Sequence, residues 1–289
     1  MEQITKIFNK IEIQSNILYI ISTPIGNLGD ISIRALKVLS LLDIILCEDT
    51  RVTKKLLNSF NIKSKKLIVY NDQSTEKQRK LIIDKIKYSN LKCGLVSDAG
   101  TPLISDPGYK LVQACMKEMI DITHIPGASS LITSLILSGL PSHNFLFGGF
   151  LEKSIMKRKK QLENILNLNF TSVWFESSKR LSETLKLILD FKVNAEISVL
   201  RELTKLNEEI IRGTASFVYN QINQKLRIRG EVVIIISTRK KTPYSSELIK
   251  SLIKENIDKY STKELSLFIS NKTGLPKKFI YNKIIEYKS

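Results

Sequence analysis

The stretch ILYIISTPIGNLGD, residues 17–30, shows the pattern that decides the fold of the first half of the chain. The short β-branched run at 17–22 predicts a strand, the Pro and Gly residues after it predict a turn, and Asp30 is placed to cap a helix over 31–42. The alternation continues with strands predicted at 44–47, 67–70, 94–97 and 122–125 and helices at 51–60, 75–88 and 109–119. Short strands that alternate with longer helices indicate an α/β domain with a largely parallel sheet, here over 17–126.

A second set of strands follows Pro126 and Gly127, which punctuate the chain. A helix at 128–138 is predicted to lead into it, with strands at 145–148, 171–175, 197–200, 209–211 and 231–237 and helices at 155–168, 181–189 and 215–221. Because strands and helices alternate less regularly here, we expect a mixed sheet in a second α/β domain over 127–238.

The last segment is basic and helical. Residues 238–244 predict a linker, and helices are predicted at 245–256, 263–272 and 276–287, in a small domain over 245–289. From Arg239 onward the sequence has 12 Lys and Arg against 5 Asp and Glu, and TGLP at 273–276 is similar to the corner of a helix-turn-helix. A nucleic-acid contact and a plain helical cap are both open interpretations of this domain.

The chain as a whole is strongly basic. Its 289 residues include 45 Lys and Arg against 28 Asp and Glu, a net charge of +17 that favours polyanions such as nucleic acid, although a biased composition would also produce it. The three cysteines and two histidines show no disulfide or zinc-ligand spacing, so no metal site is predicted and a reducing cytoplasm is the expected compartment. Residues 1–16 lack the apolar block of a signal peptide, and no later run reaches the roughly 18 apolar residues of a membrane span, so no membrane role is expected.

Three loops that follow predicted strands are candidates for a ligand site. They are TPIGNLGD at 23–30, SDAGTPLISDPG at 97–108 and PGASS at 126–130. Ligands of parallel sheets bind at the carboxyl ends of the strands, where Gly allows close backbone approach and Asp and Ser offer hydrogen bonds to a nucleoside. Taken singly, each loop is more often only a turn. The phosphate-binding pattern G-x-x-x-x-G-K-[ST] and the dinucleotide pattern G-x-G-x-x-G are both missing, which also argues against the common Rossmann-type methyltransferase fold.

An ordered series of motifs resembles the tetrapyrrole methylase superfamily. The series is YIISTPIGNLGD (19–30), CEDTR (47–51), VSDAGTPLISDPG (96–108), IPGASS (125–130), FESSKR (175–180), RELTK (201–205), Glu208-Glu209, Arg212-Gly213 and RGE (229–231). It covers about residues 18–237 and is similar to the members that methylate a ribose 2′-oxygen of a decoding-centre cytidine in 16S rRNA. The chain departs from that pattern at Ser178 and Lys179, where the family has Pro and His, so a catalytic role of that histidine would be lost here.

The resemblance implies a two-domain α/β fold of the tetrapyrrole-methylase type, a class III methyltransferase, with a cleft between the domains and a small helical C-terminal appendage. It implies S-adenosylmethionine as the cofactor, 16S rRNA within the small ribosomal subunit as the partner, and a homodimer. The residues expected to touch the cofactor are Pro24, Gly26, Leu28, Asp98, Gly100, Thr101, Pro102, Leu103, Ser129, Ser130 and Phe175. The alternatives are a tetrapyrrole methyltransferase on the same fold and a non-catalytic RNA-binding or ribosome-assembly protein.

Methyl transfer to a ribose hydroxyl requires alignment of donor and acceptor, and it gains from a base that takes the hydroxyl proton. Glu48 and Asp49, beside Arg51, are predicted to lie where a base and a phosphate clamp would reach the acceptor. A helix cap with a nearby ion pair is the plainer explanation of these three residues.

A second candidate cluster for catalysis comprises Glu176, Arg201 and Lys205, for which a buried architectural ion pair is the alternative. Lys205 would serve as a base only if burial lowers its pKa. The segment KSIMKRKK at 153–160 has five positive charges and no negative one, so it is a candidate contact for the RNA backbone at the rim of the cleft. A solvated helix face is the plainer explanation of that segment from its charge count alone.

Overall fold

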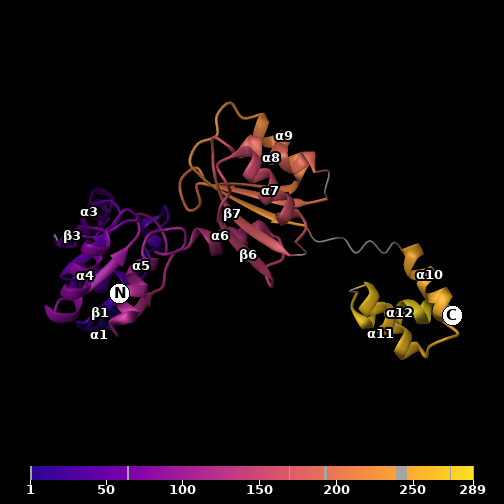
Figure 1. Ribbon diagram of the computed structural model, residues 1–289, viewed down its shortest axis with the longest axis horizontal. Coiled ribbons are helices and arrows are strands. Elements are labelled where there is room, and N and C mark those ends of the chain that lie inside the picture. The colour runs from indigo at the N-terminus through magenta and orange to yellow at the C-terminus, as the bar shows by residue number, and fades with distance from the viewer. Residues whose placement is uncertain are drawn as a thin grey trace.

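The computed structural model describes residues 2–63, 65–168, 170–191, 194–238, 246–273 and 275–288, which form two sheets with their helices and a terminal group of three helices (Figure 1). The predicted linker lies outside these residues apart from Thr238, and so does Gly274 of the predicted helix-turn-helix corner.

The first half of the chain builds a five-stranded sheet in which all neighbouring strands are parallel, as its alternating pattern predicts. In spatial order the strands are β3 (Lys66–Val69), β2 (Ile44–Cys47), β4 (Cys93–Val96), β1 (Ile17–Ile21) and β5 (Asp121–Ile125). Helices α4 (Glu76–Tyr88) and α5 (Tyr109–Lys117) cover one face, and α2 (Ile33–Leu41) and α3 (Thr50–Ser59) cover the other. Side chains of a strand alternate between the faces, so Ile44 packs toward α4 and α5 while Ile45 packs toward α2 and α3.

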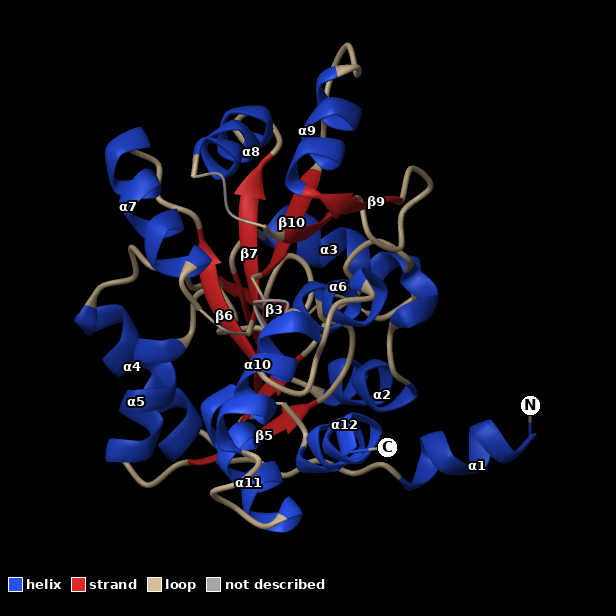
Figure 2. Ribbon diagram, turned by 90° about the vertical axis from the view of Figure 1, so that its right-hand side faces the viewer, coloured by secondary structure: helices blue, strands red, loops and turns tan. Residues whose placement is uncertain are grey.

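The second sheet is mixed, as predicted. Its order is β6 (Phe145–Phe150), β7 (Thr171–Ser177), β10 (Glu231–Ser237), β8 (Glu196–Arg201) and β9 (Glu209–Thr214), with only β6 and β7 parallel. Helices α7 (Ile155–Leu166), α8 (Leu181–Asp190) and α9 (Ala215–Asn223) cover one face (Figure 2). The other face packs on α6 (Ser130–Ser138) and on Ile25 from the loop after β1, so the two halves share a hydrophobic cluster.

The terminal helices α10 (Ser246–Asn256), α11 (Thr262–Thr273) and α12 (Lys277–Lys288) form a unit with its own core. Ile253, Leu265, Ile269, Ile280 and Ile284 are buried against one another, and Figure 1 shows this unit apart from the two sheets. The boundaries 17–126, 127–238 and 245–289 for the three domains stay predictions.

Two local predictions differ from the structure. No helix was predicted where the structure has α1 (Glu2–Lys10), although Ile4, Ile7 and Phe8 follow helical spacing in the sequence. The Phe8 ring lies 4.8 Å from the Nζ of Lys37 on α2, so a tertiary contact accompanies a helix too short to be stable alone. The prediction that Asp30 caps the next helix is wrong. Residues Leu28–Asp30 form a short 3₁₀ helix, and α2 begins after Ser32, whose Oγ accepts the Ala35 N–H at 3.1 Å.

Candidate functional site

A cavity of about 280 Å³ lies between the two halves of the chain. From the first sheet and its loops it is lined by Ile25, Glu48, Asp98, Ala99, Gly100, Thr101, Ile104, Ser105, Asp106, Ser129 and Ser130, and from the second by Phe150, Phe175, Glu176, Leu200, Leu203, Glu231, Val232 and Val233. Eight of the predicted site residues are among them, namely Glu48, Asp98, Gly100, Thr101, Ser129, Ser130, Phe175 and Glu176. The residues from the first half come together because the loops after parallel strands meet at one end of that sheet, and Phe175 and Glu176 face them from β7 of the second sheet.

Hydrogen bonds tie the three Gly/Pro loops into one wall of this cavity. Thr23 and Gly100 exchange backbone hydrogen bonds of 2.8 and 3.1 Å, and the Thr101 hydroxyl donates to the Ala128 carbonyl at 3.0 Å. Gly100 has φ +82°, and a Cβ there would lie 3.1 Å from a methyl group of Ile25. Glycine is therefore needed where this loop approaches the loop after β1.

The loop after β1 makes the contact between the two halves. A Cβ on Gly26 would lie 2.4 Å from Cγ of Lys205, and the Asn27 N–H donates to the Thr204 hydroxyl at 3.0 Å. Pro24, Gly26, Leu28, Pro102 and Leu103, which we predicted to touch the cofactor, do not line the cavity. Their cofactor role stays a prediction.

Three carboxylates, Glu48, Asp98 and Asp106, form what we call the acidic edge of the cavity. Burial, followed by the negative charge of Asp98, raises the pKa of Glu48, and burial, together with the negative charge of Asp49, raises the pKa of Asp98. Burial, followed by the negative charge of Glu48, raises the pKa of Asp106 to about 7. Asp106 was not predicted, although it belongs to the SDAGTPLISDPG loop that drew attention to Asp98.

Asp49 and Arg51 lie outside the cavity and show the helix cap and ion pair that were the plainer explanation of their sequence. Asp49 accepts the Arg51 N–H at 2.8 Å at the start of α3 and pairs with the Arg51 guanidinium at 2.6 Å. Hydrogen bonds from Arg51 lower the pKa of Asp49 to about 2. The Arg51 side chain is 89% exposed and lines a second cavity of about 270 Å³ with Thr50, Lys54, Lys65 and Leu67, which we call the basic cavity.

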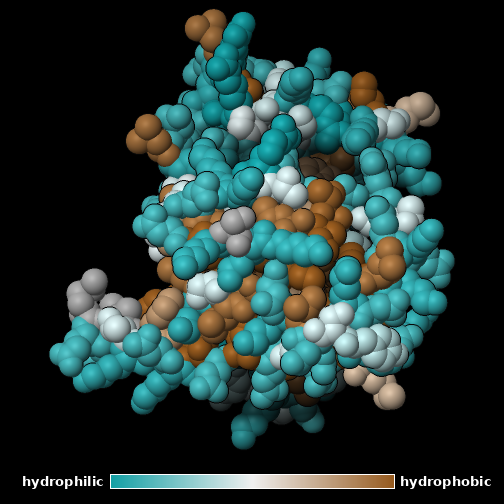
Figure 3. All heavy atoms as spheres, turned by 90° about the vertical axis from the view of Figure 1, so that its left-hand side faces the viewer, coloured by the Kyte–Doolittle hydropathy of each residue, from teal (hydrophilic) through white to brown (hydrophobic). Residues whose placement is uncertain are grey.

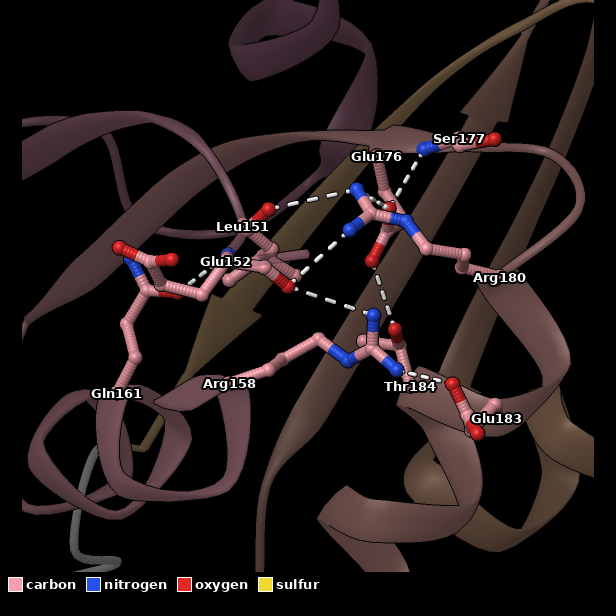
Figure 4. Close-up of polar contacts among 9 residues, drawn as sticks. All are labelled: Leu151, Glu152, Arg158, Gln161, Glu176, Ser177, Arg180, Glu183 and Thr184. Carbon is pink, nitrogen blue, oxygen red and sulfur yellow. Dashed lines mark hydrogen bonds and ion pairs between the residues drawn. The ribbon is translucent and has the colours of Figure 1, made fainter. Parts of the chain in front are cut away.

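Glu176 is held by a complete set of polar partners (Figure 4). One carboxylate oxygen pairs with Arg180 at 2.5 Å and accepts the Ser177 N–H at 2.6 Å, and the other accepts the Thr184 hydroxyl at 2.7 Å. Arg180 also donates to the carbonyls of Leu151 and Glu152, at 3.3 and 3.1 Å. This network joins β7 to the end of β6 and occupies both oxygens of Glu176, which argues for a positioning role rather than proton transfer.

The basic segment 153–160 is not uniformly exposed. Arg158 is fully buried, pairs with Glu183 and donates to the Glu152 carbonyl at 3.4 Å (Figure 4). For Arg158, the prediction that the segment contacts the RNA backbone is therefore wrong. Its Nε is buried without a partner among the described residues. The four lysines of the segment are exposed.

Arg201, the last residue of β8, and Lys205, in the loop after it, both form ion pairs. Arg201 pairs with Glu209 at 2.7 Å, and Lys205 pairs with Glu202 at 3.0 Å and with Glu231 at 3.3 Å. Burial would lower the pKa of Lys205, but hydrogen bonds to these two carboxylates outweigh it and raise the pKa above its usual value. Lys205 therefore stays protonated at neutral pH, and the condition for its use as a base is not met.

Neither a metal-ligand cluster nor a membrane-spanning helix is present among the described residues. No group of three or more His, Cys, Asp or Glu side chains there could hold a metal ion. Likewise, no helix within that part of the chain is long and apolar enough to cross a membrane.

Known proteins share this architecture and sequence. A family model of tetrapyrrole (corrin/porphyrin) methylases matches residues 17–218. The ribosomal RNA small subunit methyltransferase I of Rickettsia prowazekii is 47% identical over 220 residues, which are 76% of this chain and 78% of that protein. The protein of the same name from Halalkalibacterium halodurans is 38% identical over 272 residues, 92% of this chain and 93% of its own length.

Solved structures confirm the predicted fold class. A cobalt-precorrin-4 methyltransferase of cobalamin biosynthesis superposes with a TM-score of 0.55 at 16% identity, covering 77% of this chain and 95% of its own. A uroporphyrin-III C-methyltransferase from Thermus thermophilus, complexed with S-adenosylhomocysteine, superposes with a TM-score of 0.52 at 15% identity, covering 76% and 96%. By the family model and by its similarity over most of its length to such relatives, this chain belongs to the tetrapyrrole methylase family, alongside the proteins named ribosomal RNA small subunit methyltransferase I.

Proposed function

We propose that this chain transfers a methyl group from S-adenosylmethionine to the 16S rRNA of the small ribosomal subunit, at the ribose 2′-oxygen of a decoding-centre cytidine. The observation that carries the proposal is the similarity to ribosomal RNA methyltransferases over most of the chain. The tetrapyrrole enzymes share the fold at much lower identity.

The chemistry of the cavity fits S-adenosylmethionine. This donor supplies a methyl group on a positively charged sulfur. Phe175, Leu200 and Leu203 give the cavity an apolar wall that suits the adenine ring. Glu48 and Asp98 of the acidic edge offer negative charge to the sulfonium and the ammonium group, and Gly100 lets the loop backbone approach closely.

Exposed positive charge supports an RNA substrate. The basic cavity offers the exposed side chains of Arg51 and Lys54 on α3, close in sequence to Glu48 of the acidic edge, while Lys65 beside them is half-buried and donates to the Ser40 carbonyl at 2.7 Å. The exposed lysines of 153–160 and the basic terminal helices add to it. Such groups bind phosphates without reading sequence, so the position of the acceptor would be set by the shape of the subunit.

We further propose that the enzyme acts as a homodimer. On α6, Ile132 and Ile136 are 46% and 72% exposed one helical turn apart, and Phe145 of the edge strand β6 is 40% exposed. Hydrophobic residues also gather at the centre of the otherwise mostly hydrophilic face drawn in Figure 3. Exposed apolar areas of this kind are typical of partner contacts. Sedimentation of the full chain at micromolar concentration tests the dimer, and a monomer would contradict it.

The decisive experiment for the reaction is transfer of labelled methyl to small ribosomal subunits purified from a strain that lacks the enzyme. Label should appear on one cytidine, and digestion should recover it on the ribose 2′-oxygen. Parallel reactions use protein-free 16S rRNA and an anionic tetrapyrrole as acceptors. Label on a base, or transfer to the tetrapyrrole only, would refute the proposal, and binding of RNA without binding of S-adenosylmethionine would indicate a non-catalytic protein.

A further inference from the structure

The proposed reaction releases a proton from the acceptor hydroxyl, and most residues predicted as its base are committed elsewhere. Asp49 caps α3 outside the cavity, Glu176 has both oxygens occupied, and Lys205 is held in its charged form by two carboxylates. On the second sheet, Glu231 pairs with the same lysine. The remaining carboxylates that line the cavity are those of the acidic edge.

Within the acidic edge, Glu48 and Asp98 both accept backbone N–H groups that link loops after different strands. Glu48 accepts the Asp98 N–H, and Oδ1 of Asp98 accepts the Asp49 N–H at 3.2 Å, so the two carboxylates tie the loop after β4 to the segment between β2 and α3. A carboxylate that holds two loops together in its charged form is a poor proton acceptor, because protonation would weaken that contact.

The backbone around Asp106 is held in an unusual conformation. Leu103 and Ser105 have φ of +73° and +65°, a region that side-chain-bearing residues rarely adopt. Gly108, at φ +138°, has no room for a Cβ, which would lie 2.8 Å from side-chain atoms of Leu95 and Leu103. Strain that the surrounding packing maintains is typical of functional sites, and here it places Ile104, Ser105 and Asp106 in the cavity wall.

We propose that Asp106 is the base that accepts the proton of the RNA 2′-hydroxyl as that oxygen attacks the methyl group, an inference that rests on the proposed function. The O–H bond breaks and its proton passes to the Asp106 carboxylate. The freed electron pair of the oxygen forms the bond to the methyl carbon, and the carbon–sulfur bond breaks with its electrons, which neutralise the sulfonium. No other reactant is needed.

The charged groups around Asp106 explain why it suits this task near neutral pH. They are Glu48 after β2, Asp98 after β4 and Asp72 after β3, with Glu176 and Glu231 across the cavity bound to Arg180 and Lys205. Burial and the nearby acids raise the pKa of Asp106 to about 7, and the Ser97 hydroxyl opposes them by a hydrogen bond. A base with a pKa near the working pH combines a useful deprotonated fraction with a useful affinity for the proton.

The test is single-turnover methyl transfer to small ribosomal subunits at a series of pH values. The wild-type rate should rise with pH and level off above about pH 7, as the Asp106 carboxylate becomes deprotonated. Asp106→Asn should be slower by roughly 10²–10⁴-fold and should lose this rise, whereas Asp106→Glu should keep it at a lower rate. Glu48→Gln should move the rise to lower pH, because one negative charge beside Asp106 is gone.

Two controls separate proton transfer from other effects. Calorimetry should show that Asp106→Asn binds S-adenosylmethionine within about threefold of the wild type. Asp121→Asn, the same chemical change at the opposite end of the first sheet, should leave both the rate and its pH dependence unchanged.

Specific results would overturn the assignment. It fails if Asp106→Asn keeps the rate or its pH dependence, if lost affinity for S-adenosylmethionine accounts for the whole loss of rate, or if Glu48→Gln abolishes the rise instead of moving it. Failure of the wild-type chain to methylate subunits would instead refute the proposed function, and the assignment would fall with it.

Discussion

Replacement of Asp106 by Asn should stabilise the folded protein at neutral and alkaline pH. Burial and the charge of Glu48 raise the pKa of Asp106 from 3.8 to about 7, so the folded state binds this proton more tightly than the unfolded chain does. The stability that this proton gives is complete below about pH 4 and is lost as the pH rises through about 7, whereas Asn does not titrate. At about 1.36 kcal/mol per pK unit the full difference would be about 4 kcal/mol. Because the side chain is only half-buried, water screens part of it, and we expect about 1–2 kcal/mol.

Urea unfolding of the wild type and Asp106→Asn without S-adenosylmethionine measures this effect. The free energy of unfolding of the variant should exceed that of the wild type by about 1–2 kcal/mol at pH 8, and the gap should shrink toward pH 4. Asp121→Asn serves as the control, since no such gap is expected there. An equal gap at both pH values, or a variant less stable than the wild type at pH 8, would show that the fold does not hold Asp106 in its neutral form.

Three further substitutions test other parts of the structure. Gly148→Ala should cost about 1–3 kcal/mol, because the new Cβ would lie 2.0 Å from the Trp174 ring; an unchanged melting temperature would contradict this packing. Gly26→Ala places a Cβ 2.4 Å from the Lys205 side chain, so the contact between the two halves must shift and S-adenosylmethionine binding should weaken several-fold; unchanged affinity in calorimetry would show that this contact does not shape the cavity. Arg158→Met keeps the packing of the buried stem and should stay within about 1 kcal/mol of the wild type in urea unfolding. Arg158→Ala leaves a void and should cost about 2–4 kcal/mol, and equal losses in the two variants would contradict that explanation.

Strands buried on both faces were the most predictable part of the fold. The predicted ranges 44–47 and 231–237 coincide with β2 and β10, because a continuous apolar run bounded by polar residues marks both ends of such a strand. Helix α1 was not predicted although it had a local signal, the helical spacing of Ile4, Ile7 and Phe8; only its contact to α2 is beyond the reach of local pattern. The start of α2 was misplaced because Asp30 and Ser32 are both good caps by residue type, and only the backbone conformation selects Ser32.

The candidate site was partly predictable for a topological reason. Loops after parallel strands converge at one sheet edge, so Glu48, Asp98 and Gly100 could be grouped from the strand pattern alone. Asp106 lies further along the same loop, and its place in the cavity depends on a backbone path with two positive φ angles that residue types do not reveal. The burial of Arg158 did have a signal, since it lies four residues before Leu162 on the apolar stripe of α7.

The buried guanidinium of Arg158 changes how mutagenesis of its neighbourhood has to be interpreted. Neutralising every positive residue of 153–160 would remove the charges of four exposed lysines. It would also remove the buried Arg158 guanidinium, whose hydrogen bond to the Glu152 carbonyl connects α7 to the segment after β6. Weaker RNA binding after such a change would then have two causes, the loss of lysine contacts to phosphates and a less stable connection between β6 and α7. Variants that spare Arg158 measure the first contribution alone.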